Sequence, residues 1–358
     1  MTSMKRRTFI KNSTGGALAM GLPLFSGIPT AFQETRFGAA EATFMLRRYR
    51  KIKSKKYPEY ADALEMIEHF SSLGFSGAQL TMHGLDSKLA KKILKRRKEL
   101  NFFMEGQIKL PKDETDVARF DQQVQETKAM EVEIIRTVCL SGRRYENFDS
   151  KEAFQNFRRS SEKSLQLAEP IMRKHKMRLA VENHKDWRTD EFLEILKHLD
   201  SEWVGVTLDT GNNLSLMEDP MEVVKALAPY AFTVHLKDMA VEEYEDGFLM
   251  SEVNLGDGFL DIEGMISVLR KHNPDIRFNL EMITRDPLKI PCLTENYWAT
   301  FDKITARELA VFLQKIKEHK SKDALARVSE MSEDEQLALE IENNETSVRF
   351  AKKNFGFS

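Results

Sequence analysis

The chain has 358 residues, of which 41% are hydrophobic and 31% are charged, and its formal net charge at pH 7 is −2. A chain of this length and composition can bury a full hydrophobic core, so a large folded domain is expected. The nearly balanced charge provides no overall basic field, which argues against a nucleic-acid partner.

The first 31 residues are expected to be an export signal rather than part of the fold. Basic residues that include Arg6 and Arg7 precede a short apolar stretch rich in glycine and alanine. This order is typical of a signal peptide, and the paired arginines are typical of twin-arginine export. The stretch is too short for stable membrane insertion. The predicted partner is the twin-arginine export machinery, the predicted location is the periplasm or another exported compartment, and cleavage is expected after Ala31 or Ala42.

Strand-like and helix-like patterns alternate from about residue 41 to residue 320. The eight strand-like runs are residues 43–46, 77–82, 102–107, 134–138, 178–182, 204–209, 231–235 and 277–281. Helical patterns separate them; between Phe192 and Leu199, for example, apolar residues recur at the spacing of one helix face. Parallel strands need crossover connections, so this alternation predicts a parallel sheet. The predicted fold class is α/β, a (β/α)₈ barrel, with a doubly wound open sheet as the alternative.

Residues 321–358 follow the predicted barrel and contain no catalytic motif. They are rich in charge, with apolar positions at Leu337, Leu339, Ile341 and Val348. This pattern predicts a short C-terminal helical extension of one or two helices. Its apolar positions would pack on the barrel or on a partner subunit, so a homo-oligomer is one of the expected assemblies.

Four of the strand-like runs end on side chains that commonly bind metal ions. These are Glu182, Asp209, His235 and Glu281. In a barrel, the carboxyl ends of the strands carry the catalytic groups, so these four side chains should meet at one end. Oxygen ligands with one imidazole suit manganese, magnesium, cobalt or zinc, and one divalent ion is the predicted cofactor. Each residue taken alone has another interpretation, as a helix cap or a loop residue.

Strand parity adds candidate substrate contacts. Side chains two positions apart face the same way, so His184 should accompany Glu182, and Lys237 should accompany His235. Lys109 and His83 follow the ends of two earlier strand-like runs. Alternatively, His184 orients Glu182, Lys237 pairs with Asp238, and His83 is a polar residue of the barrel rim.

Four segments resemble the xylose isomerase-like TIM-barrel superfamily, over roughly residues 41–320. They are Val-Glu-Asn-His at 181–184, Leu-Asp-Thr-Gly-Asn at 208–212, Val-His-Leu-Lys-Asp at 234–238 and Asn-Leu-Glu at 279–281. The resemblance implies that Glu182, Asp209, His235 and Glu281 bind one divalent metal. It also implies that Glu182 and Glu281 act as acid and base on opposite faces of a sugar. Asn212 stands where many epimerases of the group have a histidine and is a further candidate substrate contact.

These residues together predict an exported, metal-dependent sugar isomerase or epimerase. Its chemistry would be proton abstraction next to a carbonyl through a metal-stabilised enediolate, and its substrate a small carbohydrate. The same enediolate serves the first alternative, a lyase or dehydratase acting on keto sugars or keto-glycosides. The second alternative, from a different class, is a non-catalytic carbohydrate-binding barrel.

Overall fold

The structure is a computed structural model that describes residues 36–49, 52, 54–301 and 304–357. The predicted export signal, residues 1–31, lies outside the described residues. Within the described part of the chain, no helix is long and apolar enough to cross a membrane.

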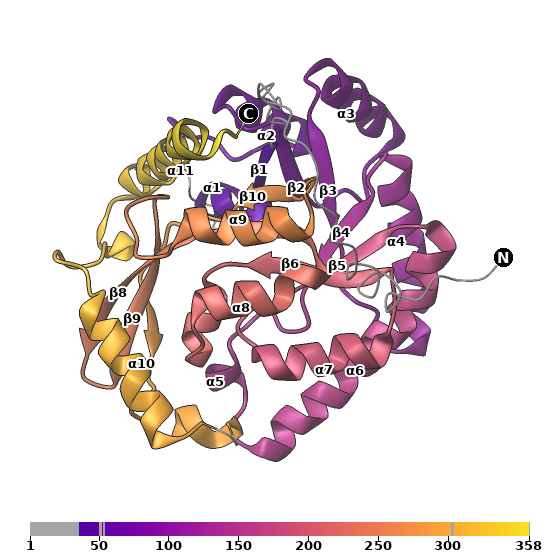
Figure 1. Ribbon diagram of the computed structural model, residues 1–358. Helices are drawn as coiled ribbons and strands as arrows, with labels where there is room; N and C mark the ends of the chain where they lie inside the picture. The colour runs from indigo at the N-terminus through magenta and orange to yellow at the C-terminus, as the bar shows by residue number, and fades with distance from the viewer. Residues whose placement is uncertain (1–35, 50–51, 53, 302–303, 358) are drawn as a thin grey trace, which may run out of the picture. The chain divides into compact units, whose positions relative to one another are not determined.

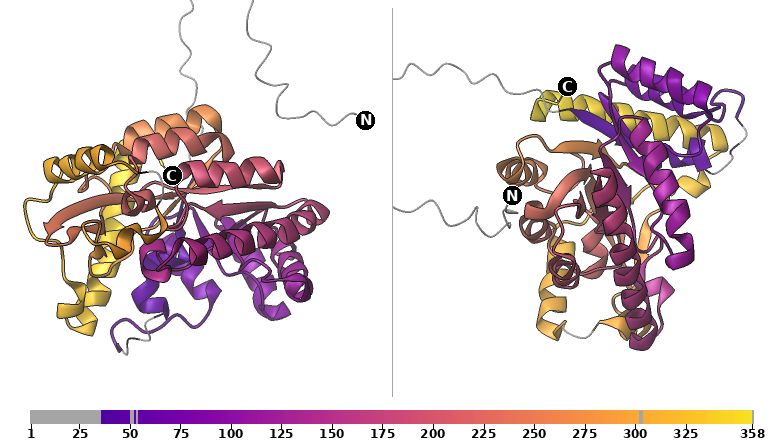
Figure 2. Two further views of the ribbon diagram at one scale, coloured as in Figure 1. Left: turned by 90° about the horizontal axis from the view of Figure 1, so that it is seen from below. Right: turned by 90° about the vertical axis from the view of Figure 1, so that its right-hand side faces the viewer.

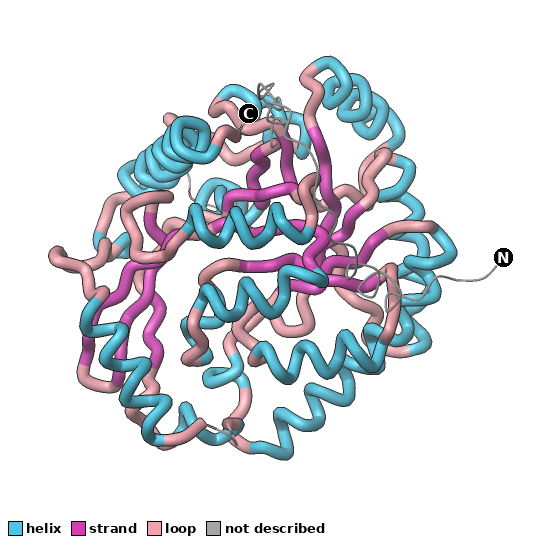
Figure 3. The backbone as a smooth tube through the Cα atoms, in the orientation of Figure 1, coloured by secondary structure: helices cyan, strands magenta, loops and turns pink. Residues whose placement is uncertain are grey.

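Eight parallel strands close into a barrel and confirm the predicted fold class. In barrel order they are β1 (Phe37–Ala40), β2 (Gly77–Leu80), β3 (Phe103–Gln107), β4 (Ile134–Thr137), β5 (Arg178–Glu182), β6 (Val204–Asp209), β7 (Ala231–Leu236) and β10 (Arg277–Leu280), which pairs with β1. Figure 3 shows the barrel strands toward the middle of the molecule with helices around them. The carboxyl ends of all eight strands therefore meet at one mouth of the barrel.

Helices lie around the outside of the strands (Figures 1 and 2). They are α1 (Met45–Tyr49), α2 (Ala63–Ser72), α3 (Ser87–Glu99), α4 (Val117–Ala129), α5 (Arg144–Asn147), α6 (Lys151–His175), α7 (Thr189–Leu199), α8 (Pro220–Leu227), α9 (Ile262–His272), α10 (Ala306–Glu318) and α11 (Glu333–Phe355). Aspartates begin several of them: Asp62, Asp86 and Asp219 each accept two backbone N–H groups of the first turn. Such caps satisfy donors that a helix start would otherwise leave unpaired.

The predicted position of the first strand, residues 43–46, is wrong. The strand is Phe37–Ala40, and the chain then turns through a 3₁₀ helix, Glu41–Phe44, into α1. A Cβ atom at Gly38 would lie 2.6 Å from the side chains of Asn279 and Phe103, so the strand needs a very small residue there. Small residues have weak strand propensity, which hid the strand in the sequence. Cleavage after Ala42 would remove β1, whereas cleavage after Ala31 would leave it intact.

The predicted C-terminal extension contains α11, which packs on the barrel beside β1 and β10. The Phe357 ring stacks on Phe37 of β1 with centroids 4.8 Å apart and lies 5.1 Å from the Phe278 ring of β10. Phe357 follows the end of α11; on the helix itself, the Glu340 carboxylate accepts the backbone N–H groups of Leu46 and Arg47 at 2.7 and 3.2 Å. The helix is therefore part of the helical layer that covers the barrel.

Replacing Glu340 by alanine should lower the free energy of unfolding by about 1–3 kcal/mol, because a buried backbone donor loses its partner. Urea unfolding at neutral pH measures this change. Glu342→Ala is the matched control, since Glu342 is exposed on the same helix. Equal stability of the two variants would show that the carboxylate does not anchor α11.

A three-stranded antiparallel sheet, absent from the sequence prediction, extends from β7. It consists of β8 (Asp238–Tyr244), β9 (Gly247–Val253) and β11 (Leu288–Ile290). Phe312 and Ile316 of α10 pack with Phe248 and Ile290 of this sheet in a second hydrophobic core. The sheet matters for the site because β9 carries Glu252, whose carboxylate lies 3.5 Å from the Lys237 ammonium.

Candidate metal centre

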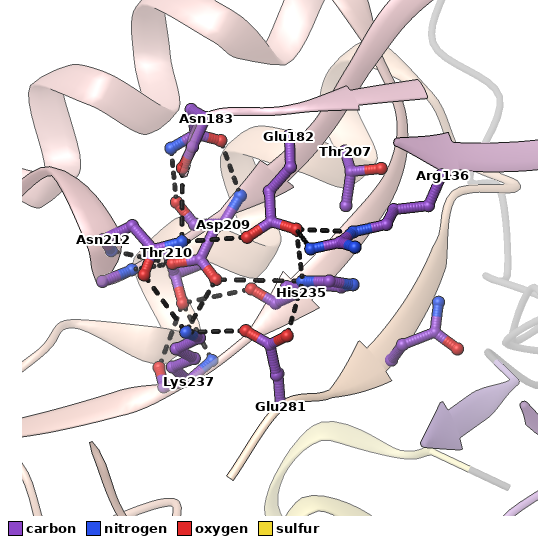
Figure 4. Close-up of polar contacts among 12 residues, drawn as sticks. Arg136, Glu182, Asn183, Thr207, Asp209, Thr210, Asn212, His235, Lys237 and Glu281 are labelled. Carbon is purple, nitrogen blue, oxygen red and sulfur yellow. Dashed lines mark hydrogen bonds and ion pairs between the residues drawn. The ribbon is translucent and has the colours of Figure 1, made fainter. Parts of the chain in front are cut away.

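Four side chains from neighbouring strands converge at the mouth of the barrel. Glu182 ends β5, Asp209 ends β6, His235 lies in β7, and Glu281 directly follows β10. Each offers one ligand atom, and these atoms all lie within 4.8 Å of one another. All four side chains are buried. The structure thus brings together the four predicted metal ligands, and Figure 4 shows them pointing toward a common centre.

The His235 ring is held so that Nδ1 faces the carboxylates. Its Nε2 atom lies 2.8 Å from Gln79 Oε1, while Gln79 Nε2 donates to Glu105 Oε2 at 3.1 Å. Because the Gln79 amide group donates to Glu105, its oxygen must accept from His235 Nε2. Nδ1 is then the nitrogen that faces the carboxylates, 3.4 Å from Glu182 Oε2 and 3.4 Å from Glu281 Oε1, and it would offer its lone pair to a metal once its proton is released. It has no hydrogen-bond partner among the described residues, as suits a metal-binding nitrogen.

Cations surround the carboxylates of the cluster. Arg136 Nε donates to Glu182 Oε2 at 2.7 Å, and Lys237 Nζ lies 2.7 Å from Glu281 Oε2 and 3.1 Å from Asp209 Oδ2. Burial alone would raise the pKa of Glu182, but the charges of Arg136 and His235 lower it below its usual value. Burial is likewise outweighed by Lys237 and His235, which lower the pKa of Glu281. Burial prevails at Asp209 and raises its pKa to about 6.

The donor set fits one divalent ion. Three carboxylates and one imidazole are hard to borderline ligands, which suit manganese, magnesium, cobalt or zinc rather than soft metals. The unpartnered His235 Nδ1 is the structural observation that supports this assignment most directly. Glu182, Asp209, His235 and Glu281 are the residues that would hold the ion.

Binding of a divalent ion should release about one proton per site near pH 8. Burial disfavours a charged His235, but Glu281 and Glu182 outweigh burial and raise its pKa to about 10 in the metal-free protein. Protons therefore compete with the metal, and affinity should fall as pH falls, more steeply below about pH 6, where Asp209 also takes up a proton. Calorimetry in two buffers of different ionisation enthalpy measures the proton count. Identical apparent binding enthalpies in both buffers would contradict this expectation.

Gln79→Leu should weaken metal binding about 10–100-fold, because His235 loses the acceptor that fixes its orientation. Calorimetric titration with manganese measures the change. Gln125→Leu, at an exposed position on α4, is the control. Unchanged metal affinity in Gln79→Leu would mean that the Gln79 amide group does not fix the orientation of His235.

The other predicted site residues fall into two groups. Asn212 and Lys237 are buried at the centre: Asn212 Nδ2 donates to Glu182 Oε1 at 3.0 Å, and Lys237 Nζ lies 3.2 Å from Asn212 Oδ1. His83 and Lys109 instead line a neighbouring cavity of about 680 Å³, whose wall also includes Arg136. His184 is half-buried, and burial together with Lys185 lowers its pKa to about 3.

The structure contradicts one alternative for Lys237, a salt bridge with Asp238. Instead of pairing with Lys237, the Asp238 carboxylate accepts the backbone N–H groups of Gly256 and Gly258 at 2.9 and 3.0 Å. It thereby holds the glycine loop that precedes α9. The Lys237 ammonium pairs instead with carboxylates of the centre, Asp209 and Glu281.

Sequence reasoning missed three residues of the centre. Arg136 lies inside β4 in Ile-Ile-Arg-Thr, and Gln79 lies inside β2 in Gly-Ala-Gln-Leu. A lone polar residue within a buried strand was the available signal for both. Glu252 had no such signal, because the strand that carries it was not predicted.

Comparison with known proteins supports the fold and an enzymatic role. A protein-family model described as xylose isomerase-like TIM barrel matches residues 67–315. The 3-oxo-isoapionate decarboxylase of Pectobacterium atrosepticum is 27% identical over 151 residues, which are 42% of this chain and 51% of that protein. The chain thus spans about half the length of this curated relative.

Two solved structures share the fold at low sequence identity. A D-psicose 3-epimerase determined in the presence of D-fructose has a TM-score of 0.56 and 13% identity, covering 90% of this chain and all of that one. A xylose isomerase-like TIM-barrel protein from Mycobacterium smegmatis in complex with magnesium has a TM-score of 0.52 and 14% identity, covering 79% of this chain and 98% of that one. Likeness at this level of identity concerns the fold alone.

Proposed function

Because the chain belongs to the xylose isomerase-like TIM-barrel family, we propose that it is a metal-dependent enzyme that removes a proton next to a carbonyl group of a carbohydrate, as a sugar isomerase or epimerase does. The observation that carries the proposal is the convergence of Glu182, Asp209, His235 and Glu281, with ligand atoms within 4.8 Å of one another. The arginine pair near the start of the chain supports the further proposal that the enzyme works after twin-arginine export.

The chemistry follows from the side chains of the centre. A bound divalent ion would supply a Lewis acid for a carbonyl oxygen and a neighbouring hydroxyl oxygen. Glu182 or Glu281 accepts the proton from the carbon next to the carbonyl, and the electrons of the broken C–H bond form the double bond of an enediolate. Arg136 and Lys237 keep both carboxylates ionised, so a base is available at neutral pH. Return of the proton to the neighbouring carbon gives isomerisation, and return to the opposite face gives epimerisation.

A decarboxylase or other lyase is the second candidate, and two observations favour it. The curated relative acts as a decarboxylase of an oxo acid, according to its name. In addition, Arg136 and Lys237 lower the pKa values of the two glutamates, which weakens them as bases. Loss of carbon dioxide or of a leaving group also yields an enediolate or enolate but does not require a strong base at that step.

Solvent exchange distinguishes these candidates from a binding module. The metal-loaded protein is incubated in deuterium oxide with a panel of keto sugars and keto-sugar acids, and the products are analysed by nuclear magnetic resonance and mass spectrometry. Deuterium at a carbon next to the carbonyl, dependent on metal, supports the isomerase or epimerase. Release of carbon dioxide or elimination supports the lyase. Sugar binding with neither result across the panel would contradict both and favour a carbohydrate-binding barrel.

A further inference from the structure

Lys185 is a buried cation that the proposed chemistry does not use. It follows β5, and its side chain is 2% exposed. Its ammonium donates to Asn212 Oδ1 and forms no ion pair with a carboxylate among the described residues. Burial, followed by the charges of Lys237 and Arg285, lowers its pKa to about 7. A buried ammonium group without an anion is costly, and a bound anion would stabilise its charged form.

Lys185 and Lys237 converge on one amide oxygen. Lys237 Nζ lies 3.2 Å from Asn212 Oδ1, the same atom that accepts from Lys185. An amide oxygen can accept two hydrogen bonds, but it neutralises neither charge. Lys237 has carboxylates on its other side, at Asp209 and Glu281. Lys185 therefore holds the unbalanced charge of the pair.

The carboxylates and side-chain cations of the described cluster leave the charge of a bound metal unbalanced. The connected carboxylates are Glu182, Asp209, Glu252 and Glu281, and the connected cations are Arg136, Lys185, Lys237 and Arg285. These four negative and four positive side chains cancel, so with His235 neutral as a metal ligand the two charges of a divalent ion remain without an offset within this set of residues. In a buried site such an excess favours an anionic ligand.

We propose that the substrate is a keto-sugar acid whose carboxylate binds the Lys185 ammonium beside the metal centre, an inference that rests on the proposed function. The carboxylate supplies the anion that Lys185 lacks and reduces the excess charge that the metal creates. Neutral sugars satisfy neither requirement.

A matched pair of ligands tests the assignment. 2-Keto-D-gluconate and D-fructose share a carbon skeleton and differ at one end, where the acid has a carboxylate in place of a hydroxymethyl group. Calorimetry on the metal-loaded protein should show binding of the acid about 10- to 100-fold tighter than that of the neutral sugar, as expected for a charge-assisted hydrogen bond. D-Fructose 1-phosphate has a larger anionic group, further from the keto carbon, so the enclosed position of Lys185 should make it bind less tightly than the carboxylate.

Variants tie this preference to one side chain. Lys185→Met should abolish the preference, Lys185→Arg should retain most of it, and Lys225→Met, an exposed charge on α8, should leave it unchanged. Melting temperatures verify that each variant is folded. If Lys185→Met does not fold, the inference is tested by comparing the ligands on the wild-type protein with and without metal. The preference should shrink in the metal-free protein, where the two charges of the ion are missing.

The inference and the proposed function can fail separately. The inference is overturned if the acid binds no more tightly than the neutral sugar, or if neither ligand binds. It is also overturned if the phosphate binds more tightly than the acid, or if the preference for the acid survives in Lys185→Met. If such a protein still exchanges protons of neutral keto sugars, the proposed function stands alone. If the protein prefers the acid but catalyses no exchange, decarboxylation or elimination, the anion site is supported and the proposed function is refuted.

Discussion

Glu281→Gln should lower the rate of solvent-proton exchange into a keto-sugar substrate by about 10²–10⁴-fold, the usual contribution of a general base. Glutamine keeps the size of the side chain but cannot accept the proton. Exchange followed by nuclear magnetic resonance in deuterium oxide measures the effect. The same loss is expected for Glu182→Gln if both carboxylates act in turn.

In that experiment, a loss of bound metal must be distinguished from a loss of the catalytic base. Metal content is therefore measured on the same samples, and exchange is compared at full occupancy. Glu263→Gln, at an exposed position on α9, is the matched control. A Glu281→Gln protein that is fully loaded and exchanges protons at the wild-type rate would refute the role of Glu281 as a base.

Lys237→Met should lower the free energy of unfolding of the metal-free protein by about 3–5 kcal/mol, the cost of leaving buried charges unpaired. Lys237 is 1% exposed and is the cation shared by Asp209, Glu281 and Glu252. Burial opposes its charge, but Asp209 and Glu281 outweigh burial and raise its pKa. A divalent ion replaces the lost charge, so metal should restore part of the stability.

Urea unfolding with and without manganese measures both effects. Lys225→Met serves as the control, because Lys225 is exposed and its loss should change stability little. Wild-type stability of metal-free Lys237→Met would show that the three carboxylates do not depend on this ammonium. A large loss that metal does not reduce would place the ion somewhere other than beside Lys237.

The barrel and the four candidate ligands could be predicted because both depend on local patterns. A parallel strand aligns its carboxyl end with those of its neighbours, so a ligand-type residue that closes an apolar run is placed at the barrel mouth by topology alone. Glu182, Asp209 and Glu281 all satisfied that pattern, and His235 lies one residue before its strand ends.

Other parts depend on contacts between distant segments. Strand β1 has a glycine at position 38 because Phe103 and Asn279 crowd it, and neither neighbour is visible in the local sequence. Lys185 continues the Glu182 segment, but its contact is with Asn212, in the 3₁₀ helix that follows β6. The sheet that supplies Glu252 interrupts the strand–helix alternation on which the prediction relied.

The most direct test of the metal centre is the metal content of purified protein, measured by mass spectrometry for the wild type beside Asp209→Ala. We predict about one manganese, cobalt, zinc or magnesium ion per wild-type chain and its loss in the variant, as expected when one ligand of a four-residue site is removed. No metal in the wild type after incubation with divalent ions, or equal content in both proteins, would contradict a metal centre at Glu182, Asp209, His235 and Glu281.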